Sequence, residues 1–191
     1  MSRCLYAGLI ALTLLAGLPN LASAQASKVD CGRLNFSFAQ ASDAVSVECY
    51  RSRETEAESG DSPADFSWTY DTMFVIAHDH VVRITRAVAG MQAYFRKTSV
   101  RSLMEGLDEL QAPGQWESEP NFRHYQIVRF HATVWNQESE CFGFVKYGSA
   151  RIFLRGGSGG ASSLVAGYAC WPRTAPDRAT IEALLDAIKS S

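Results

Sequence analysis

The sequence holds one local cluster of side chains that could bind a metal ion, at His78, Asp79 and His80. On a β-strand His78 and His80 would share one face, because side chains alternate, and both imidazoles could reach one metal. A zinc site needs three or four ligands, and only His124 and His131 remain as further histidines. A polar turn is the simpler interpretation. The cluster leaves open a metal-binding periplasmic protein, and we predict no other cofactor.

A G-x-S-x-G pattern at residues 156–160 puts Ser158 where a serine hydrolase carries its nucleophile. In α/β-hydrolases that serine stands between a strand and a helix, and Asp and then His follow it. No histidine follows His131, so this order is impossible here. An envelope hydrolase using Ser158 stays an alternative because geometry, not order, defines a triad. A flexible loop is the simpler interpretation, and we predict no catalytic residue.

Four side chains in the middle of the chain could hold an anionic group. The alternation from Phe122 to Val134 predicts a strand, and one of its faces carries Arg123, Tyr125, Arg129 and His131. The opposite face is more apolar and should point inward. Guanidinium groups bind carboxylates and phosphates through two parallel hydrogen bonds. We therefore expect this sheet face to contact an unknown envelope protein or an anionic ligand, with an ordinary solvent-facing surface as the alternative.

Other site types lack their sequence signatures. No G-x-G-x-x-G or P-loop stands between a strand and a helix, and the acidic residues of positions 54–65 do not have calcium-loop spacing. The formal net charge is −2, which argues against nucleic acid as a partner because that binding depends on a basic surface.

The first 24 residues have the three-part layout of a secretory signal peptide. Arg3 provides a positive start, Leu5 to Leu18 is apolar, and Ala22-Ser23-Ala24 resembles a cleavage site. The apolar run is shorter than the roughly 20 residues that span a bilayer as a helix. We expect residues 25–191 to form a single domain that is periplasmic or secreted and does not span the membrane after cleavage. An uncleaved anchor is the alternative.

Four cysteines follow the predicted signal peptide, at Cys31, Cys49, Cys141 and Cys170. An even number in an exported chain indicates two disulfides. Three pairings are possible, and we favour Cys31–Cys49 and Cys141–Cys170 because the members of each pair are close in sequence and lie on neighbouring predicted strands. The absence of C-x-x-C spacing favours a structural role over redox chemistry or metal binding.

Periodicity predicts an α+β fold with a mostly antiparallel sheet, an inserted helix and a C-terminal helix, stabilised by disulfides. The helices are expected at Ser99–Gln111 and about Asp177–Lys189, and residues 51–65 are expected to form a polar loop. Strands are expected at 34–38, 45–50, 66–77, 80–87, 122–134, 141–147, 150–155 and 164–170.

Three short segments near the C-terminus carry a resemblance: Cys141-Phe142-Gly143-Phe144, Gly167-Tyr168-Ala169-Cys170-Trp171-Pro172 and Ile181-Glu182-Ala183-Leu184-Leu185-Asp186-Ala187-Ile188. In them the chain resembles small secreted proteins of unassigned function from alphaproteobacteria. The resemblance implies a bacterial envelope protein in which the last two cysteines frame a hairpin and the final helix packs on it. Together with the residues above, it leads us to expect an exported, non-enzymatic envelope protein that binds a partner or ligand through a sheet face.

Overall fold

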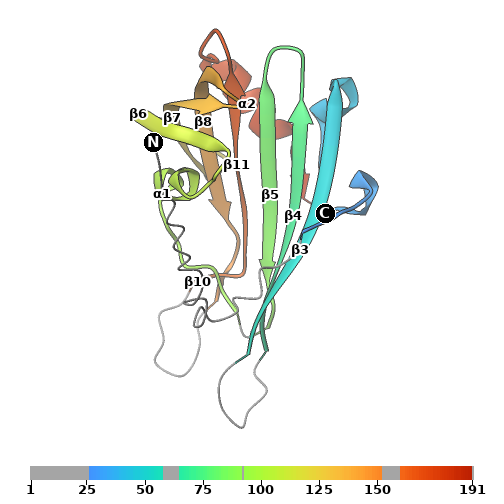
Figure 1. Cartoon of the computed structure of the whole chain (residues 1–191). Coiled ribbons are helices and arrows are strands. Elements are labelled where there is room, and N and C mark those ends of the chain that lie inside the picture. Colours follow the sequence, from blue (N-terminus) through green and yellow to red (C-terminus); the bar gives the residue numbers. More distant parts are fainter. Residues whose placement is uncertain (1–25, 58–64, 92, 152–159, 191) are drawn as a thin grey trace, which may run out of the picture.

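A computed structural model describes residues 26–57, 65–91, 93–151 and 160–190. Its centre is an antiparallel sheet of eight strands, as expected for the α+β class. The strands lie in the order β1 (Ser27–Lys28), β3 (Ser46–Ala57), β4 (Asp65–Ile76), β5 (Val81–Ala89), β11 (Ser163–Trp171), β8 (Gln137–Tyr147), β7 (Tyr125–Val134) and β6 (Leu110–Phe122). The sheet is strongly twisted, so β6 lies across the direction of β5 in Figure 1.

The sheet joins two meanders that are far apart in the sequence. Hairpins connect β3 to β4 to β5 and β6 to β7 to β8, and β11 then pairs with both β5 and β8. Two small ribbons flank this sheet, one of β2 (Phe36–Phe38) with β12 (Ile188–Ser190) and one of β9 (Ala150–Arg151) with β10 (Gly160–Ala161). The residues that line one face of β5 and β11 therefore come from distant parts of the chain.

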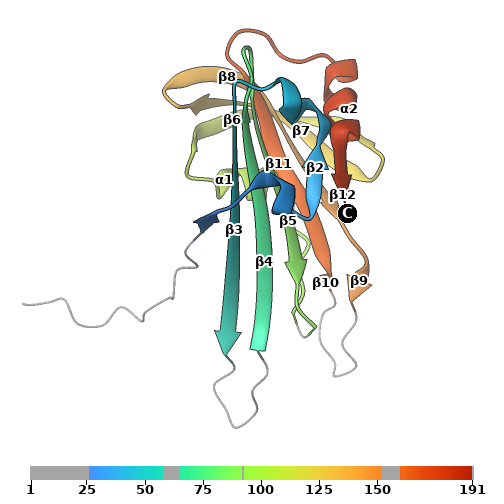
Figure 2. The same cartoon turned by 90° about the vertical axis from the view of Figure 1, so that its right-hand side faces the viewer.

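One face of the sheet is covered by α2 (Arg178–Ala187) and the β2–β12 ribbon (Figure 2). Asp177 caps α2 by accepting a hydrogen bond from the Thr180 backbone N–H at 2.8 Å. The apolar side of α2 packs on the buried residues of β4, β5 and β8, and its own buried members include Ile181, Leu184 and Leu185. This side forms the larger of two apolar cores.

The opposite face carries α1 (Val100–Glu105), which packs mainly on β6, β7 and β8 and lies beside β11. Val100 and Met104 of α1 pack over Gly143 of β8, where a Cβ atom would lie 2.7 Å from the Met104 Cγ. The glycine therefore lets the helix approach the strand closely. The rest of this face, over β3 and β4, has no helix on it in Figure 1.

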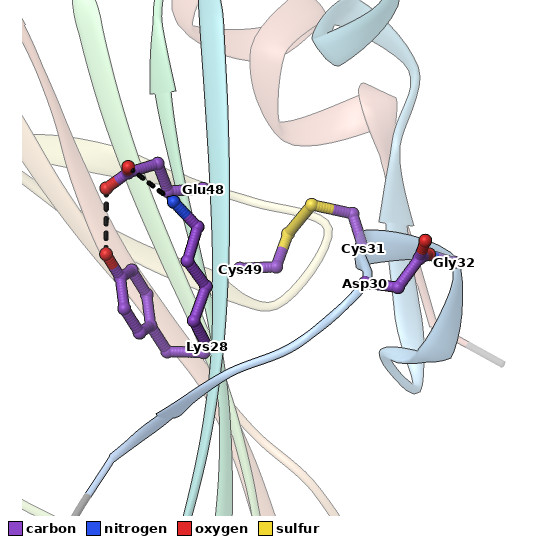
Figure 3. The surroundings of a disulfide bond; sticks show 7 residues. Lys28, Asp30, Cys31, Gly32, Glu48 and Cys49 are labelled. Carbon is purple, nitrogen blue, oxygen red and sulfur yellow. Dashed lines mark hydrogen bonds and ion pairs between the residues drawn. A yellow bond between two sulfur atoms is a disulfide. The ribbon is translucent and has the colours of Figure 1, made fainter.

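Both disulfides form as predicted. Cys31–Cys49 ties the 3₁₀-helix Cys31–Arg33 to β3, next to a surface cluster in which the Lys28 amine contacts Glu48 at 2.8 Å (Figure 3). Cys141–Cys170 joins directly opposed residues of β8 and β11. Each bridge fixes a segment of the chain to the central sheet.

Both helices are shorter than predicted. The first ends at Glu105 because Gly106 follows it as its C-cap, and Leu110 begins β6 instead of the last helical turn. The second ends at Ala187, since Ile188 continues as β12 and pairs with Phe38. Leu110 and Ile188 are buried, as their helical spacing predicts, but each of them lies in a strand instead of a helix.

Two other predicted boundaries are wrong. The polar segment 51–65 was expected to be a loop, yet its first seven residues extend β3 and pair with β4. The expected strand 122–134 is divided, because Arg123 and His124 form a tight turn between β6 and β7 with φ angles of 43° and 71°. Pairing with the neighbouring strand outweighs charge in the first case. Among the described residues no helix has the length and apolar character needed to cross a bilayer.

Candidate ligand-binding site

An apolar pocket of about 290 Å³ lies between α1 and the sheet, and we call it the α1 pocket. Strands β4, β5 and β11 form its floor, and α1 with the segments before and after it forms its roof. The floor residues are Tyr70, Arg83, Thr85, Leu164, Ala166 and Gly167, and the roof residues are Phe95, Leu103, Met104 and Leu107. Arg83 contributes the one charged side chain of this lining.

Hydrogen bonds to three other residues hold the segment before α1 over the pocket. Phe95 and Ala161 exchange backbone hydrogen bonds of 2.8 and 2.9 Å. The Tyr147 hydroxyl bonds the backbone of Thr98, and Arg151 donates to the Ala93 carbonyl at 3.0 Å. Such bonds position the Phe95 ring, which makes an edge-to-face contact with Tyr70 at 6.2 Å. These contacts between protein groups fix the roof over the pocket.

Arg83 is the polar group that distinguishes this pocket from an ordinary gap in the core. One of its terminal nitrogens, Nη1, donates to Glu109, and its guanidinium lies over the Phe74 ring at 5.4 Å. The side chain is only 20% exposed, and its buried Nε has no hydrogen-bond partner within the described part of the chain. A guanidinium has five N–H donors, so most of its capacity is not used by the protein.

The acidic partner of Arg83 lies beside a buried phenol. Tyr168 is 1% exposed, and the pKa of its hydroxyl is raised by burial first and by the negative charge of Glu109 second. Burial likewise raises the pKa of Tyr70, whose hydroxyl donates to Glu54 at 3.1 Å. Both phenols therefore keep their protons at neutral pH and can act as neutral hydrogen-bonding groups.

The side chains predicted to bind an anion lie on the opposite side of the sheet, at its β7 end, where they contact the protein itself. Arg129 donates from Nε to Glu119 and from Nη1 to the Pro176 carbonyl at 2.6 Å. Arg123 in the β6–β7 turn forms an ion pair with Asp186 of α2 at 2.7 Å. His131 faces Glu140 across β7 and β8 at 3.3 Å. These three side chains and Tyr125 lie in one region of the described structure, and none of them lines the α1 pocket.

Tyr125 shows that this face is not an ordinary solvent-facing surface. Its side chain is 5% exposed, and it packs with Ile127 into the core beneath α2. Burial, followed by the nearby charge of Asp186, raises the pKa of Tyr125 to about 12. Alternation along β7 correctly indicated two faces, but both are covered over much of their length, one by α2 and one by α1.

The predicted metal pair lies in the turn between β4 and β5. His80 bonds Asp79 at 2.7 Å and stacks on Trp171 with 4.9 Å between ring centroids. No group of three His, Cys, Asp or Glu side chains with metal-binding geometry occurs in the part of the chain that the structure describes. Metal binding by His78 and His80 stays a prediction that elemental analysis can test. Ser158 lies outside the described residues.

Little in the sequence indicates the α1 pocket. Arg83 stands in an ordinary strand pattern, and Glu109 lies within the helix predicted at Ser99–Gln111. One signal was available: a charged residue at 83 occurs in a strand whose neighbours at 81 and 85 share its face and are less polar. Comparisons with protein-family models, with curated proteins and with solved structures gave no match.

Proposed function

We propose that this protein is an exported binding protein that holds a small apolar molecule in the α1 pocket. Export is supported by the signal-like first 24 residues and by two disulfides, which persist in oxidising compartments. The proposed binding surface is a sheet face, but the α1 side rather than the side of Arg129. This choice follows from the internal ion pairs of Arg123 and Arg129.

The chemistry of the pocket defines the ligand class. A cavity of about 150 Å³ lined by apolar side chains accepts benzene, so 290 Å³ accommodates a substituted aromatic ring or a short acyl chain. The apolar lining favours a ligand that is mainly hydrocarbon. Arg83 and Glu109 together carry no net charge, so a neutral acceptor such as a carbonyl or ester oxygen suits the pocket better than a second carboxylate beside Glu109.

The incompletely partnered Arg83 in an otherwise apolar pocket is the observation that carries this proposal. A buried donor without a partner costs about 1–3 kcal/mol. A ligand oxygen that accepts from this guanidinium removes part of that cost. Ligand binding is therefore favoured because the ligand supplies a hydrogen-bond acceptor that the folded protein does not provide for Arg83.

Acetophenone and α-methylstyrene form a matched pair of probes, because they differ only in a carbonyl oxygen against a CH₂ group. The two compounds are titrated into the disulfide-bonded protein while the methyl NMR signals of Leu103 and Met104 are followed. We expect both signals to shift, and the ketone to bind about tenfold more tightly, which corresponds to one hydrogen bond from a charged donor.

The double variant Arg83→Met/Glu109→Gln removes the donor without leaving a buried charge unpaired. It should bind both probes with equal affinity. Arg86→Met, on the same strand but the opposite face, is the control and should keep the tenfold preference. The proposal is wrong if neither probe shifts the methyl signals, or if the ketone preference survives in the double variant.

A further inference from the structure

A second pocket, of about 470 Å³, lies at one end of the sheet, and we call it the sheet-end pocket. The β4–β5 turn and the segment after β11 meet there, at the top of Figure 2, together with the start of β8. Its polar lining comprises His78, Asp79, Gln137, Trp171, Arg173 and Thr174. None of these residues lines the α1 pocket, so this site is independent of the function proposed above.

Most polar side chains of this pocket are not used by the protein. Asp79 accepts from His80 through one carboxylate oxygen. Within the described ranges, the side chains of His78, Gln137, Arg173 and Thr174 have no hydrogen-bond partner. Solvent satisfies such exposed groups, so a ligand must replace water with groups that both donate and accept.

The charges of the pocket favour a neutral ligand. Asp79 and Arg173 carry opposite charges in the same lining, so an anion would lie near a carboxylate and a cation near a guanidinium. Hydroxyl groups avoid both conflicts, because each donates one hydrogen bond and accepts up to two. The lining therefore matches a molecule with several hydroxyl groups.

The two tryptophans of this end have different roles. His80 and Phe142 stack against the Trp171 ring, at 4.9 and 5.9 Å between centroids. These two rings leave less of the Trp171 ring face available to a ligand. A ligand that also needs an apolar platform must find it elsewhere.

We assign the platform to Trp135, which does not itself line the pocket but is close to it in the chain, in a strained backbone conformation. It forms the β7–β8 turn with Asn136, two residues before the pocket residue Gln137, and its side chain is 54% exposed. Its φ angle is 49° and that of Asn136 is 64°, where Asn and Gly are the favoured residues. A large side chain in this conformation costs about 1–2 kcal/mol. An exposed aromatic ring on a strained backbone indicates a residue that contacts a ligand rather than one that stabilises the fold.

We propose that the sheet-end pocket binds a neutral saccharide. Its hydroxyl groups exchange hydrogen bonds with Asp79, Gln137 and Arg173, and the apolar face of its ring stacks on Trp135. A neutral sugar ring combines several uncharged hydroxyl groups with an apolar ring face in one molecule.

The protein has four tryptophans, so its indole ¹⁵N–H spectrum reports on both ends of the molecule. Maltose, cellobiose and diacetylchitobiose are titrated separately as neutral disaccharide probes. We expect at least one of them to shift the Trp135 and Trp171 indole signals with a millimolar dissociation constant, equivalent to about −4 kcal/mol. The signals of Trp68 and Trp116, which lie elsewhere in the fold, should not move.

Trp135→Gly tests the platform without destabilising the folded protein, because glycine relieves the backbone strain at this position. We expect at least about tenfold weaker disaccharide binding together with an unchanged or higher melting temperature. His124→Gly is the matched control: it relieves the same kind of strain in the β6–β7 turn and should leave binding intact.

Three results would overturn the proposal. One is the absence of any Trp135 or Trp171 shift with all three disaccharides at about 50 mM, well above a millimolar dissociation constant. A second is unchanged affinity in Trp135→Gly. The third is a shift with diglycine but not with the disaccharides, which would mean that the paired charges of Asp79 and Arg173 select a zwitterion.

Discussion

Replacing Asp71 by asparagine tests how the β3–β4 hairpin is joined to the segment that carries β2. The Asp71 side chain is 2% exposed and accepts four hydrogen bonds. Arg51 donates two of them, at 2.6 and 3.1 Å, and Asn35 donates the other two, at 3.1 and 2.7 Å. The carboxylate is therefore the common acceptor for two separate parts of the chain.

The expected loss follows from the burial of the pair. Removing one partner of a buried ion pair costs about 3–5 kcal/mol. Arg51 is 34% exposed and can turn towards water, which reduces the penalty for leaving it unpaired. We therefore expect Asp71→Asn to lower the free energy of unfolding by about 3 kcal/mol at neutral pH.

The difference should also depend on pH with a definite sign. Burial raises the pKa of Asp71, but the hydrogen bonds from Arg51 and Asn35 and the charge of Arg51 outweigh it and bring the pKa below its usual value. A lowered folded-state pKa stabilises the protein above the unfolded-state value, which is about 4, and this contribution is lost as the pH falls through the folded-state pKa. The variant and the parent protein should therefore converge in acid.

Urea unfolding at about pH 7 and about pH 3 measures both effects. Asp108→Asn is the control, because Asp108 is exposed and its replacement should change stability by less than about 0.5 kcal/mol. Equal unfolding free energies of Asp71→Asn and the parent protein at neutral pH would refute the reasoning. A difference that stays constant on acidification would contradict the assigned role of the ionised carboxylate.

Three further predictions concern residues of the sheet. Cys141→Ala/Cys170→Ala opens a loop with a sequence separation of 29, which should cost at most about 3.6 kcal/mol in denaturant unfolding. Unchanged stability would mean that the bridge is redundant with strand pairing. Gly167→Ala should cost about 3 kcal/mol or more, because its Cβ would lie 2.0 Å from a backbone oxygen of β5, which cannot move aside. Gly143→Ala should cost only about 1 kcal/mol, because the flexible Met104 side chain can shift, but it should weaken probe binding in the α1 pocket. Equal stability losses in the two glycine variants would contradict this distinction.

The sequence alone was sufficient for features that depend on local patterns. Alternation identified most of the strands, and the spacing of Ile181, Leu184 and Leu185 identified the side of α2 that is buried. The cysteine pairing also followed from the sequence, since Cys141 and Cys170 were expected on neighbouring strands and face each other in the sheet. In each case the relevant partner is close in the chain or belongs to a regular repeat.

Tertiary structure decided the features that depend on long-range pairing. Pairing of β11 with both β5 and β8 brings Arg83 and Ala166 to one face, and α1 then closes a pocket over them. The packing of α2 gives Arg129 and Tyr125 internal partners, which their positions in a polar-looking strand did not reveal. The alternation of side chains along a strand determines which face of the sheet each side chain is on. Only the packing of segments that are distant in the sequence determines what that side chain contacts.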